Sequence, residues 1–220
     1  MKAMILAAGR GERMRPLTDE KPKALLRAGR RALIEHHLDA LAGAGVTDVV
    51  VNLAWLGDQL RTALGNGQRY GVTIEYSHED PEALETGGGI FRALPLLGPE
   101  PFWVVNGDVH ADYAFQDGSL APADLGRLVV VDNPEHNPSG DFALQDGRIG
   151  NSGATMCTFS GISLLRPELF AGQQDGAWPL APLLRAAAER GELAGEHHTG
   201  LWIDVGTPER LQQVADHHAR

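Results

Sequence analysis

The feature that most constrains this chain is a glycine-rich turn placed directly after its first apolar segment. Residues 2–6, Lys-Ala-Met-Ile-Leu, predict a short buried strand, and Gly9 and Gly11 follow within five residues. A glycine loop at the carboxyl end of the first strand of an open α/β sheet is a common phosphate site. Glycine allows this because it lets backbone N–H groups approach phosphate oxygens that a side chain would block. The chain is therefore expected to begin with a strand, a phosphate-binding loop and a helix.

Strands and helices alternate after this loop. Consecutive apolar residues such as Val49-Val50-Val51 are typical of strands buried on both faces of a parallel sheet. We expect strands at 46–52, 72–76, 102–105, 128–131, 158–165 and 201–205, a hairpin over 142–149, and helices at 33–41, 55–64, 86–94, 179–190 and 208–217. This order predicts a doubly wound, mostly parallel α/β sheet. We expect a single domain, with a nucleotide-binding half over about 1–112 and a small β-rich subdomain in the half over about 113–220.

The charge of the chain is unevenly distributed. Residues 1–31 hold nine of the 19 Lys and Arg but only three of the 29 Asp and Glu, although the whole chain carries a net charge of −10. An acidic protein with one basic segment favours a small polyanion as ligand and argues against a nucleic-acid polymer. A solvated basic loop is the alternative, and composition alone does not separate the two.

Composition also restricts the setting. No apolar run approaches 18 residues, so we expect no transmembrane helix and no membrane partner. The single cysteine, Cys157, excludes an intrachain disulfide and is typical of a reducing cytoplasm. We interpret Cys157 as a small core residue, because no nucleophile motif surrounds it.

Two common nucleotide-binding patterns do not fit the first loop. A dinucleotide site would need a third glycine at position 14 and an acid near position 30, where the chain has Met14 and Arg30. The P-loop pattern G-x-x-x-x-G-K-[ST] is absent as well.

The pattern that remains is L-A-A-G-x-G-x-R-M-x-P-L-T-x-x-x-P-K over residues 6–23. It resembles the signature of the sugar-phosphate nucleotidyltransferases, a family with a Rossmann-like fold. The resemblance implies that this loop surrounds a nucleoside triphosphate and that Arg13 and Lys23 are catalytic cations that offset phosphate charge. It also implies nucleotide-binding roles for Gly9, Gly11, Glu12, Arg13, Lys23 and Asn106. Fixed cations suit this chemistry because charge builds on phosphate oxygens during transfer.

Two aspartates stand at or just past the ends of predicted strands. Asp108 comes after the strand 102–105, and Asp204 lies in Trp-Ile-Asp-Val-Gly-Thr-Pro, just before the last helix. Carboxylates are preferred ligands of Mg²⁺. The family resemblance implies that Asp108 and Asp204 bind this metal together, so Mg²⁺ is the expected cofactor.

The segment Leu-Glu-Thr-Gly-Gly-Gly-Ile at residues 84–90 is similar to that of a smaller branch of the family. That branch uses UTP and N-acetylmuramic acid 1-phosphate in bacterial peptidoglycan recycling. From this resemblance we expect Thr86, Gly87, Gly88 and Asp141 to contact the sugar. A different sugar 1-phosphate, glucose or mannose, with UTP, dTTP or GTP is the alternative.

The chain departs from the family in two places. Many members have a Glu-Lys pair before the sugar-binding strand, but residues 148–158 contain none, and Ala24 replaces the usual proline after Lys23. A silent nucleotide-sugar binder would be expected to lose one of the residues above, and a glycosyltransferase would need a D-x-D motif that Asp108-Val109-His110 does not supply. We expect a monomer or small homo-oligomer.

Histidines occur in three adjacent pairs, at 36–37, 197–198 and 217–218. Neighbouring side chains in a helix or strand point apart, so each pair is a poor joint metal ligand. The sequence therefore does not predict a zinc site.

Overall fold

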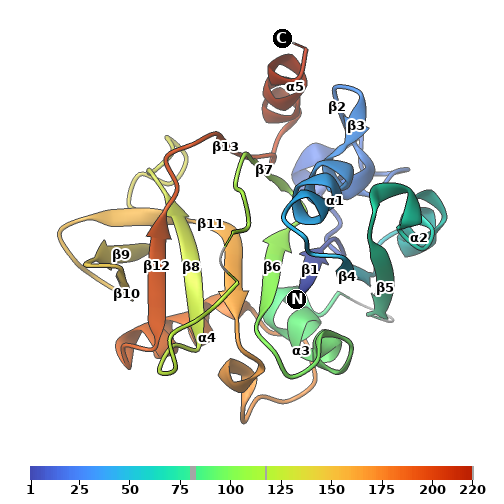
Figure 1. Cartoon of the computed structure of the whole chain (residues 1–220). Helices are drawn as coiled ribbons and strands as arrows, with labels where there is room; N and C mark the ends of the chain where they lie inside the picture. The colour runs from blue at the N-terminus through green and yellow to red at the C-terminus, as the bar shows by residue number, and fades with distance from the viewer. Residues whose placement is uncertain (80–82, 117, 220) are drawn as a thin grey trace.

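A nine-stranded sheet runs through the protein in the computed structural model, which describes residues 1–79, 83–116 and 118–219 (Figure 1). The first half of the chain contributes β1 (Lys2–Leu6), β4 (Asp48–Leu53), β5 (Thr73–His78) and β6 (Phe102–Asn106). These strands lie in the order β5-β4-β1-β6 and are all parallel. The predicted parallel α/β sheet is confirmed, and its carboxyl edge brings together the loops that follow each strand.

The second half of the chain extends this sheet rather than forming a subdomain of its own. It adds β8 (Gly126–Val131), β9 (Phe142–Gln145), β10 (Arg148–Gly150), β11 (Met156–Leu165) and β12 (Leu193–His197), in the order β6-β11-β8-β12-β10-β9. β11 runs antiparallel to both β6 and β8 and joins the two halves. The predicted small β-rich subdomain is therefore not confirmed, because its strands belong to the same sheet as those of the first half. The sequence also gave no sign of β12, where only Leu193 is fully buried and Gly195 interrupts the strand pattern.

Helices cover both faces of the sheet. They are α1 (Leu33–Gly43), α2 (Gly57–Leu64), α3 (Glu85–Leu97) and α4 (Leu180–Glu189), with short 3-10 turns at Glu12–Met14, Lys23–Leu25, Gln68–Tyr70 and Pro167–Phe170. Within the described part of the chain, no helix is long and apolar enough to span a membrane.

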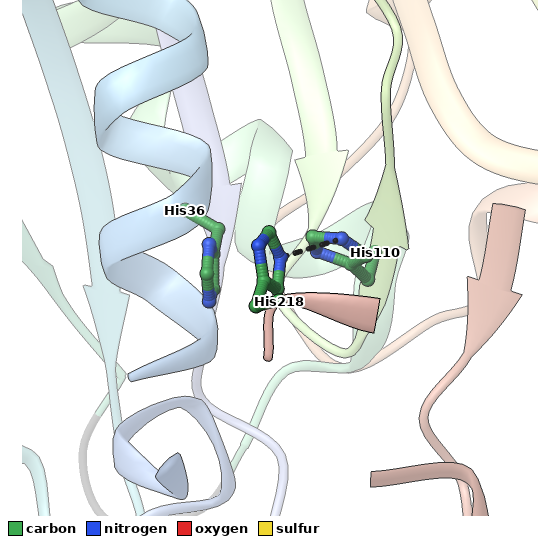
Figure 2. Close-up of side chains that lie close together, drawn as sticks. All are labelled: His36, His110 and His218. Atoms are coloured by element: carbon green, nitrogen blue, oxygen red, sulfur yellow. Dashed lines mark hydrogen bonds between the residues drawn. The ribbon is translucent and has the colours of Figure 1, made fainter. Parts of the chain in front are cut away.

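Two small antiparallel pairs lie outside the main sheet. One joins β2 (Arg27–Ala28) to β3 (Arg31–Ala32), and the other joins β7 (Val109–Ala111) to β13 (Trp202–Asp204). The last helix, α5 (Pro208–His217), begins where the Thr207 side chain accepts a hydrogen bond from the Arg210 backbone, as the sequence predicts. Its C-terminal end lies beside α1 and β7 (Figure 2).

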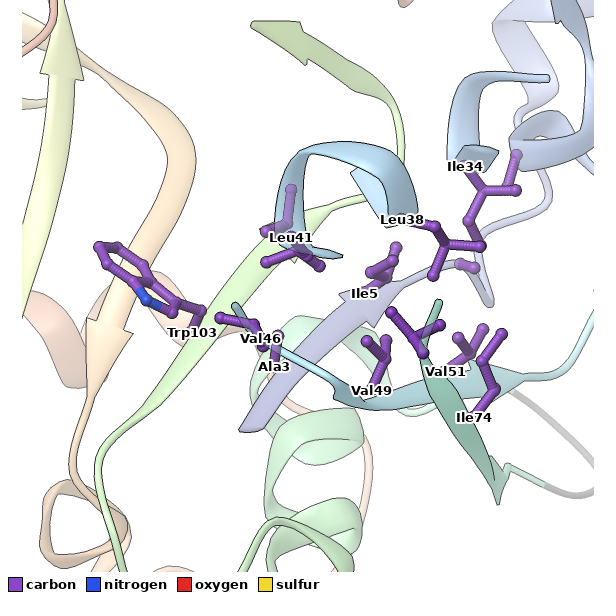
Figure 3. Packing of buried hydrophobic residues seen from close by; sticks show 14 of the residues in the cluster. Ala3, Ile5, Ile34, Leu38, Leu41, Val46, Val49, Val51, Ile74 and Trp103 are labelled. Atoms are coloured by element: carbon purple, nitrogen blue, oxygen red, sulfur yellow. The ribbon is translucent and has the colours of Figure 1, made fainter. Parts of the chain in front are cut away.

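Alternate residues of the central strands enter different hydrophobic clusters. Ala3 and Ile5 are buried in the cluster formed with α1 and α2 (Figure 3). Met4, which lies between them, packs with α3 and α4. Val49 and Val51 likewise enter the first cluster and Val50 the second. Successive side chains of a strand point to opposite faces. A run of apolar residues without alternation is therefore what a sheet covered on both faces requires.

Candidate active site

A cavity of about 450 Å³ opens at the carboxyl ends of β1, β4 and β6. Its walls come from the loop after β1, the ends of the neighbouring strands and the start of α3. They include Gly9, Gly11, Glu12, Arg13, Lys23, Asn52, Glu79, Glu85, Thr86, Asn106 and Asp108. Small-molecule sites are commonly about 300–1,000 Å³ and lie at this edge of parallel sheets.

The glycine loop is held in shape from within. Gly11 has φ of +66°, which favours glycine, and a β-carbon there would lie 3.1 Å from the side chains of Lys23 and Thr18. The buried Thr18 hydroxyl donates a 2.8 Å hydrogen bond to the Gly11 carbonyl. Gly9 differs, because a β-carbon there would meet no described atom within 4 Å. Gly9 lines the cavity, so the open space beside it is available to a ligand.

Two cations and one of the predicted aspartates meet at this loop. Lys23 is largely buried, and its Nζ lies 2.8 Å from Oδ2 of Asp108. A β-carbon on Gly206 would lie 2.9 Å from the guanidinium of Arg13, so Arg13 reaches the segment that follows β13. The structure thus brings together residues 13, 23 and 108, which the sequence predicted as one site.

The basic N-terminal segment is not a single patch. Of its nine cations, only Arg13 and Lys23 line the cavity in the described part of the chain. Arg15 pairs with Asp19, and Arg31 pairs with Asp39 on α1. The sequence-based reading of the whole segment as one anion site was therefore too broad.

Asp108 and Asp204 are joined through the backbone. The Val205 N–H donates to the Asp108 carbonyl at 2.8 Å, next to the pairing of β13 with β7. The Asp204 carboxylate lies 2.7 Å from Nη1 of Arg210 and 3.3 Å from Nε2 of His136. The fold therefore makes neighbours of two aspartates 96 residues apart, and each already faces a cation.

The cavity holds more acids than cations. Glu12, Glu79, Glu85 and Asp108 line it, against Arg13 and Lys23. A polyanionic ligand would therefore need additional positive charge. Two aspartates on adjacent backbone segments, one of them at the cavity wall, offer carboxylate oxygens, which suit Mg²⁺.

The sequence analysis did not predict a series of buried hydrogen bonds behind the cavity. The Ala7 N–H donates to Oδ1 of Asn52 at 2.6 Å, and Nδ2 of Asn52 donates to Oε1 of Glu79 at 2.6 Å. Oε2 of Glu79 accepts from the Leu84 N–H at 2.8 Å. This series ties the loop after β1 to the start of α3. The signal was present, since Asn52 and Glu79 stand at or just past the ends of predicted strands, as Asn106 does.

Asn106 and Glu12 line the cavity as predicted, whereas the sugar candidates fall into two groups. Thr86 lines the cavity, although its hydroxyl accepts from the Leu180 N–H at the start of α4. Gly87 and Gly88 are buried and both donate through their N–H groups to the Trp178 carbonyl. They do not line the cavity.

The structure shows a packing role for these two glycines, and their predicted contact with the sugar stays a prediction. A β-carbon on Gly87 would lie 2.2 Å from the Trp178 ring, and one on Gly88 would lie 2.0 Å from the Gly176 carbonyl oxygen. Close approach of the 176–178 segment to α3 thus requires glycine at both positions.

Asp141 also lies outside the cavity wall. Its Oδ2 accepts from the Phe159 N–H at 2.8 Å and from Asn137 Nδ2 at 3.2 Å. These bonds fix the loop before β9 against β11. This same loop carries His136, which faces Asp204, so Asp141 supports the loop rather than reaching the cavity described above.

His37 is fully buried behind Asp108. Burial lowers the pKa of its imidazole to about 4, with the neighbouring His36 adding to the effect and Asp108 opposing it. His37 is therefore neutral at physiological pH and adds no positive charge beside Asp108.

The chain matches known proteins over nearly its whole length. Residues 2–140 match the family described as Nucleotidyl transferase. N-acetylmuramate alpha-1-phosphate uridylyltransferase from Neisseria meningitidis serogroup B is 52% identical over 97% of this chain and 96% of its own length. The protein of the same name from Caulobacter vibrioides is 38% identical over 94% of this chain and 92% of its own length.

A solved structure has the same fold. UDP-glucose pyrophosphorylase complexed with UDP-glucose superposes with a TM-score of 0.78 and 17% identity, covering 99% of this chain and 98% of that one.

Proposed function

The chain belongs to the nucleotidyl transferase family, and we propose that it transfers a uridylyl group from UTP to N-acetylmuramic acid 1-phosphate, giving UDP-N-acetylmuramic acid and pyrophosphate. The observation that carries this proposal is the 52% identity, over almost the full length of both proteins, to a relative named for that activity. The second relative of the same name supports it. The proposed substrates are both small anions, so neither a nucleic acid nor a membrane is required.

The cavity supports the nucleotide half of this reaction. Its volume of about 450 Å³ suits a small-molecule ligand, and the open face at Gly9 leaves backbone N–H groups accessible to phosphate oxygens. Arg13 and Lys23 stand on the same wall. In this proposal they hold the triphosphate, and Glu12 and Asn106 line the space beside it.

The chemistry is a single in-line displacement. An oxygen of the sugar phosphate attacks the α-phosphorus of UTP and forms a new P–O bond. The bond from the α-phosphorus to the bridging oxygen breaks, and its electron pair leaves with pyrophosphate. Positioning two anions supplies much of the rate in such reactions. Arg13 and Lys23 would stabilise the charge that builds on the phosphate oxygens.

We further propose that Asp108 and Asp204 hold Mg²⁺, which would neutralise phosphate charge. Their neighbouring backbones and the surplus of acids in the cavity support this assignment. Lys23 and Arg210 now face these carboxylates and keep them oriented.

The sugar would lie toward the second half of the chain. Thr86 is the predicted sugar residue that lines the cavity. Gly87, Gly88 and Asp141 would act there indirectly, by fixing the 176–178 segment and the loop that carries His136.

The test is pyrophosphate release with Mg²⁺ across a panel of nucleoside triphosphates and sugar 1-phosphates. The highest kcat/KM is expected for UTP with N-acetylmuramic acid 1-phosphate. A higher value for glucose or mannose 1-phosphate with any nucleotide would replace this specificity with the alternative one. Release with no sugar in the panel would favour a silent nucleotide-sugar binder and overturn the catalytic proposal.

A further inference from the structure

Three histidines from three different elements meet next to the candidate active site. They are His36 on α1, His110 on β7 and His218, which directly follows α5 (Figure 2). One ring nitrogen from each lies within 4.8 Å of the other two. The rings of His36 and His218 stack with centroids 4.3 Å apart, and His110 meets His218 edge-on at 4.9 Å. Among the described residues, these three form the one such group of metal-ligand side chains.

The hydrogen bond of His36 leaves one of its ring nitrogens free to bind a metal. Nε2 of His36 lies 3.1 Å from the Ala28 carbonyl oxygen. Because a carbonyl only accepts, Nε2 carries the proton, and the neutral ring keeps its lone pair on Nδ1. Metal-binding histidines commonly donate their other ring N–H to a carbonyl in this way.

The other two rings already face each other. Nε2 of His110 and Nε2 of His218 are 3.2 Å apart. Two imidazole nitrogens bound to one tetrahedral zinc ion, at about 2.0–2.1 Å each, would be roughly 3.3 Å apart. The separation of these two nitrogens therefore matches a shared ion closely. The ring of His36 is stacked on that of His218, so it would have to turn to aim its Nδ1 lone pair at the same ion.

The surroundings favour a borderline metal over Mg²⁺. The group contains imidazoles and no carboxylate, and imidazole suits zinc, whereas Mg²⁺ prefers oxygen. His110 is buried, His36 is half-buried and His218 is exposed, so an ion could reach the site from solvent. His37 and His217 border the cluster, and His217 contacts the rings of both His110 and His218.

We propose that His36, His110 and His218 form a zinc site, with water as the fourth ligand. The ion would fasten the C-terminal end of α5 to α1 and β7. α5 follows Asp204, and β7 follows Asp108, so the site would hold together the two segments that carry the candidate magnesium ligands. The hydrophobic cluster under α5 is small, with Ala28, Leu33, Val205 and Val214 as its fully buried members. A metal would stabilise a helix that the core holds weakly.

The experiment measures zinc binding by the full chain, with any purification tag removed and bound metal stripped. Zn²⁺ is titrated against a chromogenic chelator in excess Mg²⁺, which occupies oxygen sites, and Tm is measured with and without Zn²⁺. We expect one Zn²⁺ per chain and a rise in Tm of roughly 5–10 °C at a hundredfold excess over Kd. Co²⁺ in place of Zn²⁺ is expected to give the intense visible absorption of a tetrahedral site.

Two variants and two controls locate the ion. His36→Gln and His218→Gln are each expected to weaken zinc binding at least about tenfold and to abolish the rise in Tm. His218 is exposed near the end of the chain, so its variant tests binding without disturbing the core. The controls are His197→Gln and Asp204→Asn, and both are expected to bind Zn²⁺ like the unaltered chain. His197 pairs with Asp132 on another part of the sheet.

The proposal is overturned if the unaltered chain takes up no stoichiometric Zn²⁺. It is equally overturned if His36→Gln and His218→Gln bind as tightly as the unaltered chain, or if Asp204→Asn alone abolishes binding.

Discussion

Glu79→Gln replaces one carboxylate oxygen by an NH₂ group, and we expect this small chemical change to destabilise the protein strongly. Glu79 is 1% exposed, and both of its carboxylate oxygens accept hydrogen bonds, from Asn52 Nδ2 and from the Leu84 N–H. A glutamine has one acceptor and one donor, so its NH₂ must face one of these donors. Asn52 cannot compensate by turning its amide, because its Oδ1 already accepts from the Ala7 N–H.

The magnitude follows from the bonds lost. A hydrogen bond to a charged group contributes about 1.5–3 kcal/mol, and a buried donor left without an acceptor costs about 1–3 kcal/mol. We therefore expect a loss of about 2–5 kcal/mol in the free energy of unfolding. For a chain of this size that corresponds to a fall in Tm of about 5–15 °C. Because the same chain of bonds holds the loop after β1, KM for UTP is expected to rise as well.

A second substitution can restore the pattern. In Asn52→Asp/Glu79→Gln, the new aspartate accepts from the Ala7 N–H and from the new glutamine NH₂, while the glutamine oxygen accepts from the Leu84 N–H. Asn52→Asp alone places two carboxylates at the 2.6 Å contact and is expected to be destabilising too.

Urea unfolding followed by circular dichroism gives the four free energies of this double-mutant cycle. The double variant is expected to lose at least about 1 kcal/mol less free energy of unfolding than the two single variants lose together. Additive losses, or a loss under about 0.5 kcal/mol for Glu79→Gln, would refute the directional chain of hydrogen bonds.

Four further predictions concern the site and its surroundings. Lys23→Met is expected to lower kcat/KM about 10²–10³-fold in the pyrophosphate assay, and a near-normal value would contradict its role as a catalytic cation. Asp204→Asn is expected to raise the Mg²⁺ concentration for half-maximal rate about tenfold or more, and an unchanged concentration would contradict its role as a metal ligand. The pKa of His37 lies near 4 when folded and near 6.5 when unfolded. The unfolded chain therefore binds more protons in that range, and stability falls by up to about 1.4 kcal/mol per pH unit as the pH drops from 6.5 to 4. Urea titrations in EDTA are expected to show a shallower fall for His37→Gln, and an equal slope would contradict its buried neutral state. Gly88→Ala is expected to cost about 1–3 kcal/mol, because its β-carbon would lie 2.0 Å from a backbone carbonyl oxygen. Gly9→Ala, with open space at the same atom, is expected to stay within about 0.5 kcal/mol of the unaltered chain while raising KM for UTP.

Most of the strands and helices could be predicted from local sequence. The consecutive valines of β4 are buried on both faces of the sheet, and the capped start of α5 lies at Thr207 as expected. β12 could not be predicted, because its pairing with β8 depends on partners far along the chain. The same reason explains why the second half joins the main sheet instead of forming a subdomain.

The residues of the site can likewise be divided into those that local sequence predicts and those that it does not. The loop signature identified Gly9, Gly11, Arg13 and Lys23 because those residues lie within one short segment whose backbone geometry is local. The position of Asn52 and Glu79 at or just past strand ends was visible in the sequence, but the hydrogen bond between them depends on how the sheet places the two segments.

The sequence by itself determined the glycine-loop signature, most of the strands and helices, and the family. The tertiary structure decided which distant residues meet: Asp108 with Val205, Gly87 with Trp178, and three histidines that come from three different elements. The physical reason is that hydrophobic periodicity and glycine geometry act over a few residues. Ion pairs, metal ligands and close packing depend on how the sheet places segments a hundred residues apart.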